Sequence, residues 1–191
     1  MPTLSRRYFS ALSATMAVLA LAPGCTKAPA ESRDQAPAGA TQAPATPLGA
    51  GAPAPDVTFS VHTGESLKLA SLRGKPVIVY FYPKDDTPGC TVEAQEIRDL
   101  YQQLQGTGAV VIGVSTDGRD SHRAFAEKHT LPFLLASDES GDIARAFGVP
   151  LKNGRATRVS FVVGADGRIK RSFPSVTPKG HAQELLSAIS S

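Results

Sequence analysis

The 191-residue sequence has only two cysteines, Cys25 and Cys90, and no Cys-x-x-Cys pair. The absence of such a pair argues against the dithiol chemistry of disulfide reductases and isomerases. The sequence contains four histidines: His62, His122, His129 and His181. They have no metal-ligand spacing with one another or with cysteine, so we expect solvated or core histidines, no metal and no cofactor. There is also no phosphate-binding loop, haem motif or hydrolase nucleophile elbow.

A strong excess of charge of one sign is absent as well. Lys and Arg number 20 against 17 Asp and Glu, which gives a net charge of +3 and a pI near 9.0. The basic residues are scattered and no cluster of stacking aromatics accompanies them, so nucleic acid is not an expected partner. The last stretch of about 140 residues has the composition of a globular protein and is long enough for one domain with one core.

Residues 1–24 are typical of an export signal. Arg6 and Arg7 precede an apolar run at 11–22, which is too short to span a membrane as a mature helix. The segment 5–9, Ser-Arg-Arg-Tyr-Phe, also resembles the twin-arginine motif, with two ordinary basic residues of an export signal as the alternative. We therefore expect export to the cell envelope.

Cys25 ends a segment, Leu21-Ala22-Pro23-Gly24-Cys25, that resembles a lipobox. In that interpretation Cys25 is acylated, becomes the mature N-terminus and anchors the protein to a membrane. Two residues depart from the pattern, because Ala22 stands where leucine is usual and Pro23 intrudes. Cleavage after Ala30 is the alternative, and it would release a soluble periplasmic protein. In both cases the domain keeps a single cysteine.

Residues 25–52 are dominated by Ala, Pro, Gly, Thr and Gln, with almost nothing that could fill a core. We expect this segment to be a disordered tether. A flexible coil of roughly 30 residues has an end-to-end distance of about 30 Å, enough to hold a domain clear of a membrane surface. The domain itself is expected over residues 53–191.

The first half of the domain has strand patterns around one helical pattern. Segments 55–61 and 67–69 are typical of a short hairpin. The continuous apolar runs 77–82 and 109–115 are typical of buried strands. Between these two runs, apolar residues recur at helical spacing until Gly106-Thr107-Gly108 ends the pattern. Because the crossover is helical, the two buried strands should be parallel.

The second half has helical patterns at 120–129, 143–147 and 178–189, and strand patterns at 133–136, 159–163 and 168–173. Asp166-Gly167 separates the last two strand patterns and predicts a hairpin. A βαβ unit followed by an antiparallel ββα unit is the thioredoxin-like arrangement. We therefore predict a thioredoxin-like α/β fold, with a central mixed sheet flanked by helices and an N-terminal β-hairpin extension.

Cys90 lies where a buried strand pattern passes into the N-terminus of a helix. An ordinary cysteine thiol, with a pKa near 8.5, is only about 3% ionised at pH 7, and the thiolate is the nucleophile. Lowering such a pKa to about 6 requires roughly 3.4 kcal/mol of stabilisation of the anion, whereas a helix N-terminus supplies about 0.3 to 1 kcal/mol. A reactive thiol at this position therefore needs a neighbouring cation.

The run that ends at Cys90 carries a resemblance to a known family. Pro83, Thr87 and Cys90 match the PxxxTxxC signature of peroxiredoxins, and the block FYPKDDTPGCTVEA is similar to the bacterioferritin comigratory, or peroxiredoxin Q, branch. The resemblance extends from about Leu48 to Ser191. It implies the thioredoxin-like fold and a thiol-dependent peroxidase.

The resemblance also implies roles for individual residues. Cys90 would be the nucleophile, and Arg158 matches the arginine of the family's R-x-S-F strand, which faces the active cysteine. The hydroxyl of Thr87 and the backbone N–H groups of Gly89 and Cys90 would hold the peroxide. Without the resemblance, Thr87 would be interpreted as a plain helix N-cap and Arg158 as a solvated charge at a strand edge.

Three further residues complete the expected site. Pro83 would shape the pocket and shield the sulfenic acid, although a proline after a strand usually just ends it. Gly89, with Pro88, supports a tight turn and lets the backbone approach the ligand. Glu93, one helical turn beyond the cysteine, matches an acidic position of the family and would orient an arginine. A solvated carboxylate on the helix face is the alternative.

Gln95 is the main departure from the branch. Many relatives have a second cysteine five residues after the first, which condenses with the sulfenic acid. Here that position is Gln95, and no cysteine follows Cys90. We predict a one-cysteine peroxidase that reduces hydrogen peroxide and organic hydroperoxides and is resolved by a thioredoxin-like protein or a small-molecule thiol. The alternative is a thioredoxin-like envelope lipoprotein with a disulfide-exchange or non-catalytic binding role.

Overall fold

The computed structural model describes residues 46–191. The expected export signal 1–24, the expected lipidation site Cys25 and most of the expected tether 25–52 lie outside the described residues. Within residues 46–191, no helix is long and apolar enough to cross a membrane. In the same part of the chain, no group of three or more His, Cys, Asp or Glu side chains is placed to hold a metal ion.

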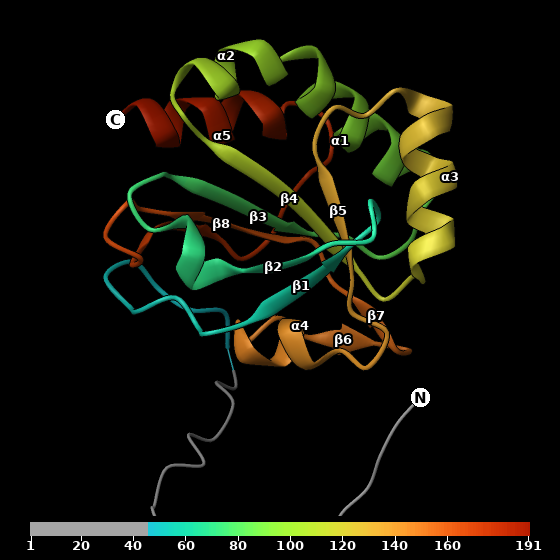
Figure 1. Cartoon of the computed structure of the whole chain (residues 1–191), viewed down its shortest axis with the longest axis horizontal. Coiled ribbons are helices and arrows are strands. Elements are labelled where there is room, and N and C mark those ends of the chain that lie inside the picture. Colours follow the sequence, from blue (N-terminus) through green and yellow to red (C-terminus); the bar gives the residue numbers. More distant parts are fainter. Residues whose placement is uncertain (1–45) are drawn as a thin grey trace, which may run out of the picture. The chain divides into compact units, whose positions relative to one another are not determined.

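The described chain alternates strands and helices along most of its length (Figure 1). The strands are β1 Thr58–Val61, β2 Ser66–Lys68, β3 Val77–Phe81, β4 Val110–Ser115, β5 Leu134–Ser137, β6 Leu151–Lys152, β7 Arg155–Ala156, β8 Val159–Val163 and β9 Ile169–Phe173. The helices are the 3₁₀ helix η1 Leu69–Leu72 and the α-helices α1 Pro88–Asp99, α2 Tyr101–Gly106, α3 Arg119–His129, α4 Asp142–Ala146 and α5 His181–Ser190.

Seven of the strands form one mixed sheet in the order β2-β1-β5-β4-β3-β8-β9. Strands β3, β4 and β5 are parallel, as helical crossovers require. Strand β8 pairs antiparallel with β3, and β9 with β8. The β1–β2 hairpin extends the other edge of the sheet by antiparallel pairing of β1 with β5. The predicted α/β fold with its hairpin extension is confirmed.

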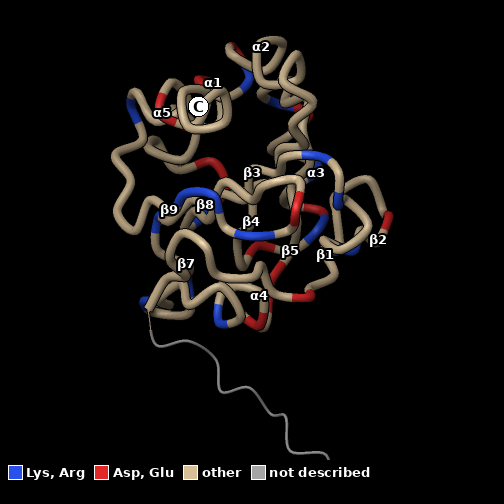
Figure 2. Tube along the Cα trace, turned by 90° about the vertical axis from the view of Figure 1, so that its left-hand side faces the viewer, with Lys and Arg blue, Asp and Glu red and all other residues tan. Residues whose placement is uncertain are grey.

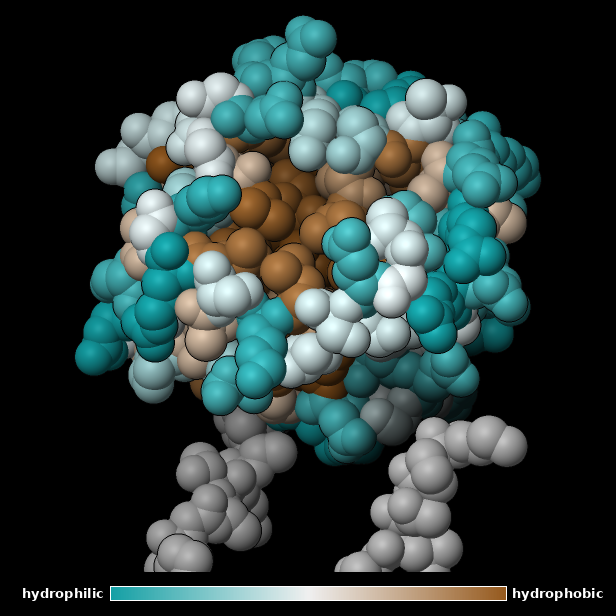
Figure 3. All heavy atoms as spheres, in the orientation of Figure 1, coloured by the Kyte–Doolittle hydropathy of each residue, from teal (hydrophilic) through white to brown (hydrophobic). Residues whose placement is uncertain are grey.

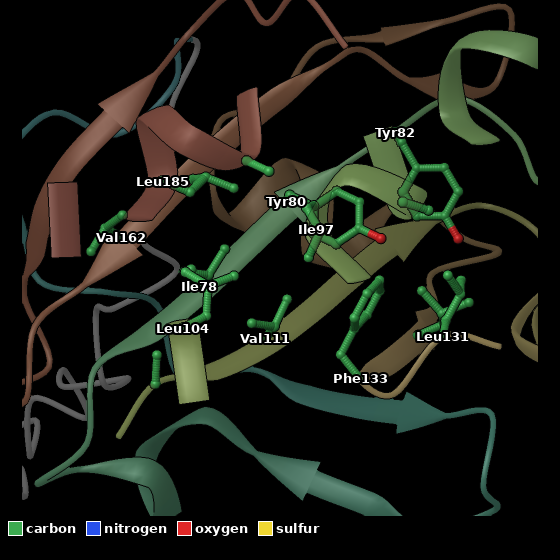
Figure 4. Packing of buried hydrophobic residues seen from close by; sticks show 14 of the residues in the cluster. Ile78, Tyr80, Tyr82, Ile97, Leu104, Val111, Leu131, Phe133, Val162 and Leu185 are labelled. Carbon is green, nitrogen blue, oxygen red and sulfur yellow. The ribbon is translucent and has the colours of Figure 1, made fainter. Parts of the chain in front are cut away.

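Helices cover both faces of the sheet. Along β3 successive side chains point to opposite faces, so both faces of this strand are apolar and its run of apolar residues is continuous. Ile78 and Tyr80 face α1, α2 and α5, where they pack with Ile97, Leu104 and Leu185 (Figure 4). The alternate residues of β3, Val77, Val79 and Phe81, face η1 and α4 in a second core. The sheet therefore lies between two apolar layers, with α1 in the first of them.

Two elements differ from the sequence expectation. The single helix predicted after the cysteine is divided at Leu100, whose φ of −97° and ψ of 3° are not helical. The small hairpin β6–β7 was not predicted. Its turn residues Asn153 and Gly154 both have positive φ, 51° and 73°, as a type I′ turn requires. The Asn-Gly pair is the signal that could have identified this hairpin.

The folded unit begins earlier than the expected boundary at residue 53. The N–H of Leu48 donates to the carbonyl of Phe147, and that of Gly51 donates to Ile169. The last few residues that composition assigns to the tether are therefore hydrogen-bonded to the domain. The side chains of Leu48 and Ala52 also pack against the second core, but a few apolar residues in an Ala- and Pro-rich stretch give no periodic signal.

The surface is mixed in charge. Basic and acidic residues are interspersed along the described trace in Figure 2. On the face shown in Figure 3, hydrophobic residues gather at the centre and polar residues surround them.

Candidate active site

Cys90 is the third residue of α1 and lies at the end of the molecule where β3 stops. Its side chain is buried, with 2% of the residue exposed. The helix begins with Pro88 at its first position, where a missing N–H costs nothing. The sulfur therefore lies beside the first turn of a twelve-residue helix, whose free N–H groups favour a negative charge.

Two side chains direct hydrogen-bond donors at the sulfur. The Nη2 atom of Arg158 lies 3.1 Å from Cys90 Sγ, and the Oγ1 atom of Thr87 lies 2.8 Å from it. Arg158 is thus a cation next to Cys90, as predicted from the sequence. A charged donor gives a stronger hydrogen bond than a neutral one. Together these two side chains place a hydroxyl and a positive charge beside the sulfur.

Thr87 occupies the N-cap position of α1 but does not act as a plain cap. Its backbone is extended, with φ −84° and ψ 148°, and its side chain makes no capping hydrogen bond. Instead the hydroxyl lies within reach of both Cys90 Sγ, at 2.8 Å, and the carbonyl of Lys84, at 3.0 Å. A hydroxyl has one hydrogen, so it can donate to only one of them at a time.

Arg158 lies immediately before β8 and is held from its other side by Glu93. Its Nη1 atom donates to Glu93 Oε2 at 2.6 Å. The arginine side chain is 19% exposed and that of the glutamate 1%, so the pair is shielded from solvent. The guanidinium thus joins a carboxylate on α1 to the sulfur one turn earlier in the same helix. Neither side chain is in the solvated state that was the alternative for each.

Glu93 has an unusual environment for a carboxyl group. Burial raises its pKa, the charge and hydrogen bond of Arg158 lower it, and the charge of Glu96 raises it, with the result that the pKa of Glu93 is about 7. Its Oε1 atom has no hydrogen-bond partner among the described residues. The group is therefore close to an even balance of its two protonation states at neutral pH.

Gly89 makes the close approach of the arginine possible. A Cβ atom at this position would lie 2.9 Å from Arg158 Nη2, the same nitrogen that donates a hydrogen bond to the sulfur of Cys90. It would also lie 3.5 Å from Cγ of Pro178, which places the loop before α5 beside the site. A Cβ atom at residue 89 would push the guanidinium from this position, so glycine leaves the space that the arginine occupies.

Pro83 lies in the bend between β3 and α1 and is half-buried. This places it on the loop that carries the other motif residues. The shielding of a sulfenic acid by its ring stays a prediction.

A buried polar network that was not predicted holds this loop. Tyr82 Oη and Ser121 Oγ each donate to a carboxylate oxygen of Asp85 at 2.7 Å, and Nδ1 of the fully buried His122 lies 3.0 Å from Asp85 Oδ2. Burial raises the pKa of Asp85, but the hydrogen bond and charge of His122 and the two hydroxyls outweigh it and lower the pKa. No local signal reveals this network, because its members are separated by up to 40 residues.

The chain is similar in sequence to known proteins. A model of the AhpC/TSA family matches residues 50–172. Peroxiredoxin Bcp of Bacillus subtilis is 40% identical over 146 residues, which cover 73% of this chain and 93% of that protein. Chloroplastic peroxiredoxin Q of Sedum lineare is 38% identical over 144 residues, 74% of this chain and 77% of that protein.

Solved structures show the same similarity. The crystal structure of peroxidoxin BcpB from Mycobacterium tuberculosis superposes with a TM-score of 0.70 at 31% identity, covering 75% of this chain and 97% of that one. The bacterioferritin comigratory protein of Xanthomonas campestris gives a TM-score of 0.66 at 32% identity, with 70% of this chain and 90% of that one covered.

Proposed function

Because the chain belongs to the AhpC/TSA family, with the Bcp and peroxiredoxin Q proteins as relatives, and is therefore a thiol-dependent peroxidase, we propose that Cys90 is the thiol that attacks the hydroperoxide. The observation that carries the proposal is the convergence of Thr87 Oγ1 and Arg158 Nη2 on Cys90 Sγ, at 2.8 and 3.1 Å. A thiolate held by a cation and a hydroxyl is activated for nucleophilic attack.

In the proposed reaction the sulfur of Cys90 takes the terminal oxygen of the peroxide and displaces the oxygen that carries R. The thiolate of Cys90 attacks the terminal oxygen of ROOH, an S–O bond forms as the O–O bond breaks, and the leaving RO⁻ takes a proton to become an alcohol or water. The sulfur ends as a sulfenic acid. Arg158 and the hydroxyl of Thr87 lie where they can stabilise the negative charge as it moves from sulfur to oxygen. The N–H groups of the first turn of α1 add to that stabilisation.

We propose that an external thiol reduces the sulfenic acid. Position 95 is glutamine, and no other cysteine follows Cys90 in the sequence. One thiol then displaces the sulfenic oxygen as water and forms a mixed disulfide with Cys90. A second thiol, from the same dithiol protein or another small molecule, attacks this mixed disulfide, which returns Cys90 to a free thiol and joins the two external sulfurs in a disulfide.

The experiment that tests this function compares wild type with Cys90→Ser in stopped-flow peroxide consumption with excess dithiothreitol. Serine at neutral pH is a poor nucleophile of nearly the same shape, so turnover should stop while the far-UV circular dichroism stays unchanged. If the variant keeps a tenth or more of the wild-type rate, the assignment of Cys90 is wrong. A non-catalytic binding protein would give no turnover with either protein.

We also propose that the enzyme acts at the cell envelope, held by a lipid on Cys25. The order of Arg6-Arg7, a short apolar run, Gly24-Cys25 and an Ala/Pro-rich segment supports this proposal. The native protein should partition into detergent, and Cys25→Ala should remain in the aqueous phase or fail to be processed. A native N-terminus at Glu31 would instead identify a soluble periplasmic enzyme.

A further inference from the structure

Outside the site, three segments meet at His129, the last residue of α3. Its Nε2 atom lies 2.9 Å from Asp86 Oδ1, on the loop that carries the motif. Its Nδ1 atom lies 3.4 Å from Nε2 of Gln95, and its carbonyl accepts from Arg98 Nη1 at 2.9 Å. His129, at the end of α3, thus contacts both the loop before Cys90 and helix α1.

Asp86 is the residue of this loop that most needs support. Its φ of 55° places it in the left-handed region, which residues with a Cβ atom adopt uncommonly and at a cost, although aspartate does so more readily than most. It directly precedes Thr87, so the backbone at Asp86 sets the direction in which the threonine side chain leaves the loop. A change of conformation at residue 86 would move the hydroxyl away from the sulfur.

Two side chains, those of Lys128 and His129, contact the carboxylate of Asp86, and they are not equivalent. Lys128 Nζ lies 2.9 Å away but its side chain is 60% exposed, and exposed ion pairs contribute little because solvent screens them. The side chain of His129 is only 13% exposed at the same distance. The hydrogen bond from His129, followed by that from Lys128, lowers the pKa of Asp86, so its carboxylate is charged at neutral pH.

The ring of His129 is itself oriented by α1. The atom facing the carboxylate must carry a hydrogen, because a carboxylate only accepts. In the neutral ring the other nitrogen is then an acceptor and can take the amide hydrogen of Gln95. The glutamine that stands where many relatives have a second cysteine thus keeps the histidine aimed at Asp86.

We propose that His129 is a positioning residue for the peroxide reaction: it holds the left-handed turn at Asp86 and so aims the hydroxyl of Thr87 at the sulfur of Cys90. The proposal rests on the proposed function of Cys90. His129 contacts no reacting atom. It affects the reaction rate only by holding the turn at Asp86, which sets the position of the Thr87 hydroxyl.

The test measures the rate constant of Cys90 oxidation by hydrogen peroxide. The chain has no tryptophan, so the reaction is followed by rapid quench, alkylation of the remaining thiol and intact-mass spectrometry. His129→Ala should slow oxidation by about tenfold, since a small misplacement of a group at the reacting atoms can cost up to about 100-fold. His129→Gln, which keeps a donor, should recover most of the rate. Arg123→Ala, on the exposed face of the same helix, is the matched control and should react as wild type.

A double-mutant cycle separates positioning from general destabilisation. In a Thr87→Val background the hydroxyl is absent, so His129→Ala should then slow oxidation by less than about twofold. A full tenfold loss in that background, or a wild-type rate for His129→Ala alone, would overturn the proposal. If Cys90 of the wild-type protein does not react with peroxide, the proposed function of Cys90 is wrong.

A second pair of variants tests the turn directly. Asp86→Gly loses the carboxylate but adopts positive φ without strain, whereas Asp86→Ala loses the carboxylate and resists that conformation. The alanine variant should therefore react several-fold more slowly than the glycine variant. Equal rates would mean that the backbone at residue 86 does not control the position of Thr87, and the proposal would be wrong.

Discussion

Replacement of Glu93 by glutamine should change how the stability of the protein depends on pH. Burial raises the pKa of this carboxyl from 4.5 to about 7, while in the unfolded chain it returns to its ordinary value. Folding therefore takes up a proton between these two pH values. The stabilisation is fully present below pH 4.5 and is lost as the pH rises through about 7.

The size of the effect follows from the difference between the two pKa values. At about 1.4 kcal/mol for each pH unit, the free energy of unfolding should fall by roughly 3 kcal/mol on this account as the pH rises from 4.5 to 8. Glu93→Gln removes the titrating group and keeps an oxygen that can accept from Arg158. The stability of the variant relative to wild type should therefore rise with pH across this range.

Urea unfolding at several pH values between 4.5 and 8, followed by far-UV circular dichroism with Cys90 kept reduced, measures the difference. Glu65→Gln is the matched control, because Glu65 is exposed, and its difference from wild type should not depend on pH. If Glu93→Gln also differs from wild type by the same amount at every pH, Glu93 is ionised throughout and the account of its burial is wrong.

Three further predictions concern the sulfur. Gly89→Ala should slow peroxide oxidation of Cys90 without loss of secondary structure, because the new Cβ would stand 2.9 Å from Arg158 Nη2; a wild-type rate in rapid quench would show that the guanidinium can move without cost. Arg158→Ala and Thr87→Val should each lower that rate by about 100-fold or more, and rates like that of wild type would mean that the pocket is misplaced. Intact-mass spectrometry after peroxide should show one added oxygen and, in excess, two, with no intramolecular disulfide. A covalent dimer as the main product would instead mean that a second subunit resolves the sulfenic acid.

The fold was largely predictable because its signals are local. The runs 77–82 and 109–115 are apolar almost throughout, as is typical of central strands that are covered on both faces, and Asp166-Gly167 indicated the last hairpin. The pairing of β1 with β5 was not predictable, because it joins residues more than seventy positions apart. The helix break at Leu100 was missed because apolar spacing continues across it while only the backbone turns.

The candidate site was predictable only in part. The family resemblance indicated Cys90, Thr87 and Arg158, and the structure brings the three together, although their catalytic roles stay predictions. Glu93 was ambiguous, because whether a helical carboxylate is solvated depends on what packs against it. The contacts of Asp86 with His129 could not be predicted, since they depend on where α3 ends relative to the loop.

The most direct test of the account is a single-turnover experiment on the reduced domain with one equivalent of hydrogen peroxide. Trapping with a sulfenic-acid reagent and peptide mapping should find close to one label on Cys90 for each peroxide consumed, and Arg158→Ala and Thr87→Val should reach the same labelling far more slowly. Peroxide consumption without a label on Cys90 would contradict the claim that this sulfur, held by Thr87 and Arg158, carries out the reaction.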